Sequence, residues 1–274
     1  MHVSMHHSRV NCTTLKKPMA PTTRIAALLL LLKHAEALAP PVVKPADVAV
    51  SGFASMARMP FAAGKGTTVL EGLAAAPPVR RPPVLYEFEA CPYCRFVREA
   101  VTALDLVVDV KPCGKGSRHR AEALKLGGKE QFPLLVDGDV VLYESADIID
   151  YLAKQRGATL EPPKNIAVSA AATAFRAGRG SSVSAGALAR PPRKLLELYS
   201  YEGNQFCRLV REVLCELDLP YRVYSAGKAS ELEALAGSSL CPYLVDPNTS
   251  FASYESAAIV SYLAETYGDF DDES

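Results

Sequence analysis

Two stretches of the chain repeat each other, and this repeat constrains the fold more than any other feature of the sequence. Residues 94–106 and 207–219 are identical at eight of 13 positions, CRFVREAVTALDL against CRLVREVLCELDL. Two further blocks match in the same order: PLLVD at 133–137 with PYLVD at 242–246, and YESADIIDYLA at 143–153 with YESAAIVSYLA at 254–264. Three matched blocks at similar spacing predict two homologous domains, at 83–156 and 194–269.

Each repeat has the same alternation of strand and helix patterns. In the first, residues 84–88 have the composition of a short strand, and apolar positions recur at helical spacing over 94–104. Asp137–Gly138 between two apolar runs is a hairpin signal, and 146–153 is a final helix that Ser145 would cap. The predicted order is β-α-β-α-β-β-α. The expected fold class is therefore α/β, with two thioredoxin-like domains in tandem, each a mixed four-stranded sheet covered by helices.

Residues 1–84 have the character of a targeting leader. Basic residues precede a short apolar run, 25–32, which is too short to span a bilayer and fits the core of a secretory signal. Residues 38–84 are basic, Ala-rich and acid-poor, as in an organelle transit peptide. Together they resemble the two-part presequence of algae with complex plastids, which implies targeting to the plastid. Another organelle, a secretory compartment or an amphipathic anchor helix are alternatives. We expect the leader to be disordered, and the mature protein to have no integral membrane segment.

The stretch between the repeats, 157–193, is rich in Ala, Gly, Ser and Arg and is interpreted as a linker. A helix is expected over 165–176, and the glycines and serines that follow would end it. We expect the linker to hold the two domains near each other.

Charge and cysteine usage exclude several classes of function. The chain has 30 basic and 30 acidic residues, a formal net charge of zero, so nothing favours a nucleic-acid partner. Its seven cysteines are scattered and odd in number, unlike the disulfide framework of a small secreted protein. His119 is the one histidine of the predicted folded part, so a Cys–His hydrolase would have to use it as its base.

The motif that carries chemistry is Cys91-Pro92-Tyr93-Cys94. It follows a predicted strand and opens a predicted helix, which places the Cys91 sulfur at a helix N-terminus, where free N–H groups favour a thiolate. Arg95 and Arg98 would add positive charge nearby. Cys94 lies one turn inside the helix, so Cys91 is the expected attacking thiol and Cys94 the resolving thiol. A structural zinc site needs four ligands and there is no second CxxC, so no metal is expected; metal binding and purely structural thiols are the alternatives.

At this point the chain resembles two related families. CPYC after a strand is the active-site motif of dithiol glutaredoxins, and the whole of 83–156 is similar to the N-terminal domain of glutathione transferases. The blocks GKGSRHR (114–120), GGKEQFP (127–133) and FRAGRG (175–180) resemble a group of plastid proteins with two such domains in tandem. The resemblance implies glutathione as cosubstrate.

The resemblance also assigns glutathione-binding roles. Pro133 stands where these folds have a cis-proline, and the backbone of Phe132 would pair with the cysteinyl backbone of glutathione. Glu144 and Ser145 stand where transferases bind the γ-glutamyl group; a hydroxyl at a helix start suits a carboxylate and Glu144 suits an ammonium. Tyr93 of the motif is assigned to the same site. An ordinary trans turn at Pro133 and a plain helix cap at Ser145 are the alternatives.

Two neighbouring features are open to two interpretations. A local basic loop would attract the glycyl carboxylate of glutathione or an acidic partner, or is simply solvated; its members are Lys111, Lys115, Arg118, His119 and Arg120. Cys113 beside it is a candidate third redox thiol.

The second repeat departs from the motif. Asn204 stands in place of Cys91, while Cys207 matches Cys94. The equivalents of the other site residues are Cys241, Pro242, Glu255 and Ser256. We therefore expect the second domain to be non-catalytic, either a binding module or a dimer-like partner for the first.

The leading functional hypothesis is a glutathione-dependent thiol-disulfide oxidoreductase with glutathione and possible protein disulfides as partners. One alternative is a transferase that uses Cys91 to activate glutathione. Another is a non-catalytic tandem module that binds glutathione or protein. An iron–sulfur cluster shared by two copies is a further alternative, disfavoured by the proline of CPYC in the resembling family.

Overall fold

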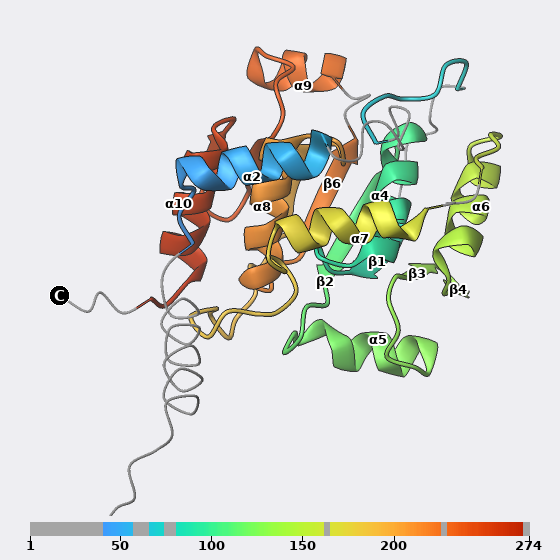
Figure 1. Cartoon of the computed structure of the whole chain (residues 1–274), viewed down its shortest axis with the longest axis horizontal. Helices are drawn as coiled ribbons and strands as arrows, with labels where there is room; N and C mark the ends of the chain where they lie inside the picture. Colours follow the sequence, from blue (N-terminus) through green and yellow to red (C-terminus); the bar gives the residue numbers. More distant parts are fainter. Residues whose placement is uncertain (1–40, 57–65, 74–80, 162–164, 226–228, 271–274) are drawn as a thin grey trace, which may run out of the picture. The chain divides into compact units, whose positions relative to one another are not determined.

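The structure is a computed structural model that describes residues 41–56, 66–73, 81–161, 165–225 and 229–270. The apolar run 25–32 and the predicted signal lie outside the described residues. The first repeat has the predicted order of elements (Figure 1): β1 Val84–Glu87, α4 Pro92–Ala103, β2 Val107–Pro112, α5 His119–Gly127, β3 Leu134–Asp137, β4 Val140–Leu142 and α6 Ser145–Gln155.

The second repeat has the same elements in the same order: β5 Leu196–Ser200, α8 Gln205–Glu216, β6 Tyr221–Ser225, α9 Ala229–Ala236, β7 Tyr243–Asp246, β8 Phe251–Ser253 and α10 Ser256–Tyr267. Both repeats are thus thioredoxin-like, as predicted. The helix expected in the linker is present as α7, Ile166–Phe175, and the side chain of Asn165 caps it by accepting the N–H of Val168.

The two four-stranded sheets join into one mixed sheet of eight strands, in the order β4-β3-β1-β2-β6-β5-β7-β8. The seam is antiparallel, with Val108 opposite Val223 and Asp109 opposite Arg222. Arg222 Nε also donates to the Asp109 carboxylate at 2.6 Å across the seam. In either repeat alone, this strand would be a sheet edge with unpaired backbone groups. Pairing β2 with β6 satisfies both edges, a consequence that the sequence did not predict.

Apolar clusters of described residues pack on both faces of the sheet. The largest runs through both repeats and contains residues of α4, α6, α8 and α10 together with one face of the strands, for example Leu85 and Leu198. On the opposite face, Tyr86 packs with Ala123 of α5. Tyr199 packs with Leu232 of α9 in the matching place of the second repeat. Successive strand residues thus serve different cores, as the period of two requires.

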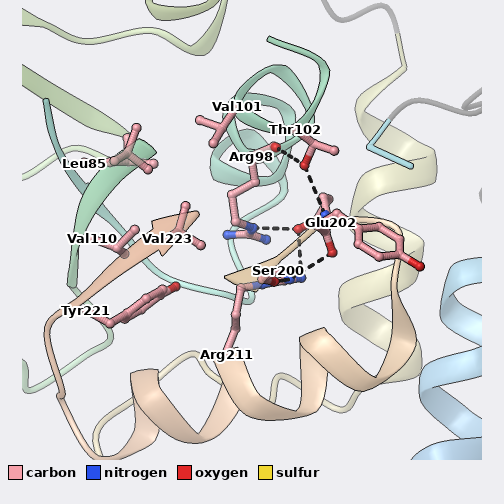
Figure 2. Close-up of a pocket in the computed structure, with 12 residues that line it drawn as sticks. Leu85, Arg98, Val101, Thr102, Val110, Ser200, Glu202, Arg211, Tyr221 and Val223 are labelled. Carbon is pink, nitrogen blue, oxygen red and sulfur yellow. Dashed lines mark hydrogen bonds and ion pairs between the residues drawn. The ribbon is translucent and has the colours of Figure 1, made fainter. Parts of the chain in front are cut away.

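A buried ion-pair network joins the repeats. Glu202, whose side chain is 0% exposed, binds Arg95 at 3.0 Å and Arg98 at 2.8 Å across the boundary and Arg211 at 2.9 Å within its own repeat. In the mirrored contact Arg211 binds Glu89 at 2.9 Å. Figure 2 shows Arg98 and Arg211 both turned toward Glu202. Arg95 and Arg98, which the sequence analysis assigned to the thiol, serve this boundary instead.

Part of the expected disordered leader belongs to the fold. α2, Pro45–Met56, packs against α8 and α7 (Figure 1). Ser51 and Ala54 are completely buried. Ser51 Oγ donates to the Gln205 carbonyl at 2.9 Å, and the Ser51 carbonyl accepts from Arg208 at 2.9 Å. The expectation of disorder throughout 1–84 is therefore wrong for this helix, because small side chains allow close contact with α8.

The repeat extends upstream of the boundaries that the sequence analysis gave it. AVS at 49–51 matches AVS at 167–169, and GKGTTV at 64–69 matches GRGSSV at 178–183. The contacts correspond as well: the Gly203 N–H donates to the Gly66 carbonyl, as the Ala90 N–H does to the Gly180 carbonyl. α2 precedes the first repeat and covers α8 of the second, whereas α7 precedes the second repeat and covers α4 of the first. Each repeat is thus covered by the helix that precedes the other.

We expect a chain that begins at residue 57 to be less stable than one that begins at residue 41. The shorter chain lacks α2, so α8 loses its cover and the hydrogen bond from Arg208 to the Ser51 carbonyl. A loss of about 3 kcal/mol would lower Tm by roughly 6–12 °C. Thermal unfolding by circular dichroism measures this difference, and equal Tm values for the two chains would show that α2 is dispensable.

Candidate functional site

Cys91 caps the N-terminus of α4. β1 ends at Glu87, and the Cys91 Sγ accepts the N–H of Cys94 at 3.3 Å. Pro92 occupies the first turn of the helix, where its missing N–H leaves no bond unmade and its fixed φ suits the helix. The succession of strand, CPYC and helix thus places the Cys91 sulfur at the N-terminus of α4, where backbone N–H groups can donate to it.

The surroundings separate the acidities of the two thiols. The main cause that lowers the pKa of Cys91 is a hydrogen bond from the Cys94 thiol to the Cys91 sulfur. The backbone N–H groups of Cys94 and Tyr93 lower this pKa further, whereas burial and the charge of Glu87 oppose the shift. Burial is the main cause that raises the pKa of Cys94 well above its ordinary value, and the neighbouring Cys91 raises it further. A hydrogen bond to the charged form stabilises that form. Cys91 is therefore the more easily ionised thiol of the pair.

Cys91 is less accessible than the sequence analysis expected. It is 4% exposed, and Cys94 is 0% exposed. The order of exposure agrees with the predicted roles, but the Cys91 thiol is not freely exposed, because it lies between the start of α4 and the 131–133 turn. Tyr93, which follows Pro92, is 52% exposed.

The proline turn comes next to the thiol. The Phe132–Pro133 bond is cis, as the resemblance implies, and so is Cys241–Pro242 in the second repeat. The Phe132 carbonyl oxygen lies 4.0 Å from the Cys91 sulfur. The Phe88 and Phe132 rings meet edge to face at 6.2 Å. The backbone that the resemblance assigns to glutathione thus borders the Cys91 thiol.

The start of α6 adjoins this turn. Gln131, the residue before Phe132, donates from Nε2 to the Glu144 carboxylate at 2.6 Å. This hydrogen bond connects the proline turn to the start of α6. α6 begins at Ser145, and Glu144 occupies the N-cap position without a capping side-chain bond, so the prediction of Ser145 as cap is wrong by one residue. Ser145 remains mostly buried at 8% exposure.

Glu144 also has an unusual backbone. Its φ is 61°, whereas the φ of the matching Glu255 is −75°. A positive φ at a residue other than glycine is unfavourable by roughly 1–3 kcal/mol and is concentrated at ligand sites. The two repeats therefore differ here as they differ at Cys91 and Asn204.

The predicted basic loop is largely committed to other contacts. Lys111 binds Glu122 at 2.7 Å, and Arg118 binds Asp218 of the second repeat at 2.7 Å. Arg120 pairs with Glu130 and donates to the carbonyls of Cys113 and Gly114. His119 is buried, and burial lowers its pKa. Lys115 has an exposed side chain.

Cys113 does not have the surroundings of a third redox thiol. It is 0% exposed within the cluster formed by Tyr86, Ala123 and Leu134. Burial raises the pKa of Cys113 strongly. A thiol that is both protonated and inaccessible exchanges slowly.

In the second repeat, Asn204 takes over the contacts of Cys91. Its Oδ1 accepts the N–H groups of Phe206 and Cys207 at 2.8 and 3.1 Å, which caps α8. Its Nδ2 donates to the Cys241 carbonyl at 3.3 Å, so that carbonyl is already bonded. Burial raises the pKa of Cys241 to about 12. Glu255 is exposed and Ser256 is mostly buried.

Two residues beside the site were missed by the sequence analysis. Thr173 Oγ1 donates to the Ala90 carbonyl at 2.7 Å, and Ser169 Oγ donates to the Pro92 carbonyl at 2.9 Å. Both lie on α7, in the stretch interpreted as a linker. The shared AVS of 49–51 and 167–169 is the signal that would have pointed to this segment.

A cavity of about 20 Å³ lies at the boundary of the repeats and is lined by Arg98, Glu202 and Arg211, among others (Figure 2). It has room for about one water molecule, so it is too small for a substrate. The described ranges contain no group of three or more His, Cys, Asp or Glu that could hold a metal ion. Among the helices of the described part of the chain, none has the length and apolar character to cross a membrane.

Comparison with known proteins agrees with the fold of the two repeats. A family model for the glutathione S-transferase N-terminal domain matches residues 85–163 and again 198–270. The two matches together cover more than half of the chain and correspond to the two repeats. A search of curated proteins finds no match.

Proposed function

The chain belongs to the glutathione S-transferase N-terminal domain family, and on that premise we propose that it is a glutathione-dependent thiol-disulfide oxidoreductase working through Cys91. The observation that carries the proposal is the contrast between the two thiols of one motif. The Cys91 sulfur accepts a hydrogen bond from the Cys94 N–H at a helix N-terminus, and the pKa of Cys91 is lowered, whereas the pKa of the buried Cys94 is raised. A family member that conjugates glutathione without redox chemistry has no need of such a pair.

The proposed reaction begins with attack by the Cys91 thiolate on the glutathione sulfur of a mixed disulfide. A bond forms between Cys91 Sγ and that sulfur, the original S–S bond breaks, and the substrate leaves as a thiolate that takes a proton from water. The thiolate of a second glutathione then attacks the bound glutathione sulfur. Glutathione disulfide leaves and the Cys91 thiolate is restored, so two electrons have passed to the substrate.

The second route uses Cys94, which attacks Cys91 Sγ, expels glutathione as a thiolate and leaves a Cys91–Cys94 disulfide. Cys94 must first lose a proton, and its raised pKa keeps the thiolate scarce at neutral pH. Two further glutathiones are needed to reduce the new disulfide. We therefore expect the route through a second glutathione to carry most of the turnover.

The proposed glutathione site runs from the Phe132 backbone to the start of α6. Phe132 borders the thiol, and its neighbour Gln131 bonds to Glu144. The first N–H groups of α6 and the Ser145 hydroxyl suit the γ-glutamyl carboxylate, and Glu144 suits the ammonium. The positive φ of Glu144 supports this assignment.

The second repeat is proposed to be a partner for the first rather than a second active site. Asn204 replaces the nucleophile and bonds to the Cys241 carbonyl, the group that would have to receive glutathione there. Its arginines and glutamates instead form the boundary with the first repeat. Targeting to a plastid is likewise a proposal, and we place any cleavage before Pro45 because α2 is part of the fold.

Mass spectrometry of the protein equilibrated in glutathione redox buffers tests the function. We expect Cys94→Ser to carry one glutathione, on Cys91, and the unaltered protein to form the Cys91–Cys94 disulfide in the more oxidising buffers. Cys207 and Cys241 are expected to stay free of glutathione. Absence of any adduct on Cys91 would contradict the proposal. Formation of a thioether between glutathione and a model electrophile would favour the transferase alternative.

A further inference from the structure

We propose that α7 is a clamp for the nucleophile, in which Ser169 and Thr173 position Cys91 through the backbone on either side of it. The inference rests on the proposed function only in taking Cys91 as the reacting thiol. It assigns to the stretch between the repeats a direct role at the active site of the first.

The two hydroxyls bracket the cysteine. Thr173 Oγ1 donates to the carbonyl of Ala90, the residue before Cys91, at 2.7 Å. Ser169 Oγ donates to the carbonyl of Pro92, the residue after it, at 2.9 Å. Ser169 is 1% exposed, so water is a poor substitute for its hydroxyl.

The Pro92 carbonyl matters because of the peptide plane to which it belongs. That plane also contains the Tyr93 N–H, and this N–H is one of the groups that lower the pKa of Cys91. A hydrogen bond to the carbonyl therefore fixes the direction of the N–H and polarises it toward the sulfur. The Ala90 carbonyl likewise shares its plane with the Cys91 N–H, which donates to the Phe88 carbonyl at 3.0 Å.

The clamp is itself fixed from both repeats. Arg95 of α4 donates to the Ser169 carbonyl and to the hydroxyls of Ser169 and Thr173. At the far end of α7, Arg176 binds Glu212 of α8 at 2.7 Å. The second repeat thus contributes to the site of the first through the placement of α7.

The second repeat supplies an internal comparison. Ser51 of α2 matches Ser169 and donates to the Gln205 carbonyl in the same way. Ser55 matches Thr173, but its hydroxyl has no hydrogen-bond partner among the described residues. The contact made by Thr173 is therefore present only in the repeat that has a cysteine at the cap. Packing of a helix onto the domain does not require it.

The test is the pH dependence of Cys91 alkylation by iodoacetamide in the full chain, with the alkylated residue located by peptide mass. Thr173→Val removes the hydroxyl but keeps the shape, and Ser169→Ala removes the other. We expect the pH midpoint to rise by about 0.5–1 unit in each, a three- to tenfold loss of thiolate below the midpoint. Thr173→Ser should restore the unaltered midpoint, and Ser55→Ala should leave it unchanged.

A lower Tm with an unchanged midpoint in Thr173→Val and Ser169→Ala would overturn the proposal, because it would reduce α7 to a structural role. Should either variant fail to fold, Thr173→Ser and Ser169→Thr are measured instead, because both keep a hydroxyl. A rise of a full unit in the pH midpoint of Cys91 alkylation in either of these would also overturn the proposal. Alkylation needs no glutathione. A shifted midpoint in a protein without oxidoreductase activity would therefore support the clamp and contradict the proposed function.

Discussion

Cys91→Ser is expected to reduce the rate of mixed-disulfide reduction to that of the uncatalysed exchange, whereas Cys94→Ser is expected to keep activity with glutathione. Serine at position 91 can still cap α4, so the fold should survive the change. Its hydroxyl is not ionised near neutral pH and makes no disulfide. Cys94 cannot take over, because it is fully buried and its pKa is raised. The measurement is formation of glutathione disulfide, with release of the substrate thiol, from a small glutathione mixed disulfide at saturating glutathione.

Cys241→Ser is the matched control for this experiment. Cys241 lies beside the cis-proline of the second repeat and is more exposed than the other described cysteines. Because Asn204 replaces its would-be nucleophile and burial raises the Cys241 pKa to about 12, we expect full activity in Cys241→Ser. Full activity in Cys91→Ser, or loss of activity in Cys241→Ser, would contradict the assignment of the chemistry to the first repeat.

Glu202→Ala is expected to have the largest effect on stability. Glu202 balances Arg95 and Arg98 of the first repeat and Arg211 of its own, all inside the protein. Its removal leaves three buried guanidinium groups short of one negative charge. Removing one partner of a buried network typically destabilises a protein by about 3–5 kcal/mol. The expected fall in Tm is roughly 6–20 °C.

A surface pair gives the comparison for this variant. Lys154 and Asp150 of α6 are 72% and 62% exposed and form an ion pair one helical turn apart. Asp150→Ala should therefore change the free energy of unfolding by less than about 1 kcal/mol. Urea unfolding of both variants makes the comparison. If Glu202→Ala is no less stable than Asp150→Ala, the boundary between the repeats is held by the β2–β6 seam and the apolar core alone.

The network has a second consequence, for the way in which the repeats pair. Glu89 and Glu202 occupy matching positions, and each binds the matching arginine of the other repeat, Arg211 or Arg98. These contacts are satisfied together in one relative arrangement of the two repeats. A buried charge that is left unpaired is strongly unfavourable, so other arrangements are disfavoured even where the apolar surfaces fit.

Much of each repeat could be predicted from the sequence because its cues are local. The period of apolar residues over 94–104, the Asp137–Gly138 turn and the prolines at 133 and 242 each depend on a few neighbouring residues. The dithiol could be predicted for the same reason, since a strand, CPYC and a helix in succession place Cys91 at a helix N-terminus. The internal repeat then predicted that Asn204 stands where the nucleophile should be.

The tertiary structure alone decided what covers these elements. An arginine that forms a buried ion pair has the same appearance in a sequence as a solvated one, so Arg95 and Arg98 were assigned to the thiol rather than to Glu202. A short helix of small residues such as α2 carries little periodicity, so its sequence does not distinguish it from a leader. Ser169 and Thr173 lie about 80 residues from the cysteine that they bracket. Periodicity in a sequence records that a face is buried, but the partner that buries it is fixed only by packing over long range.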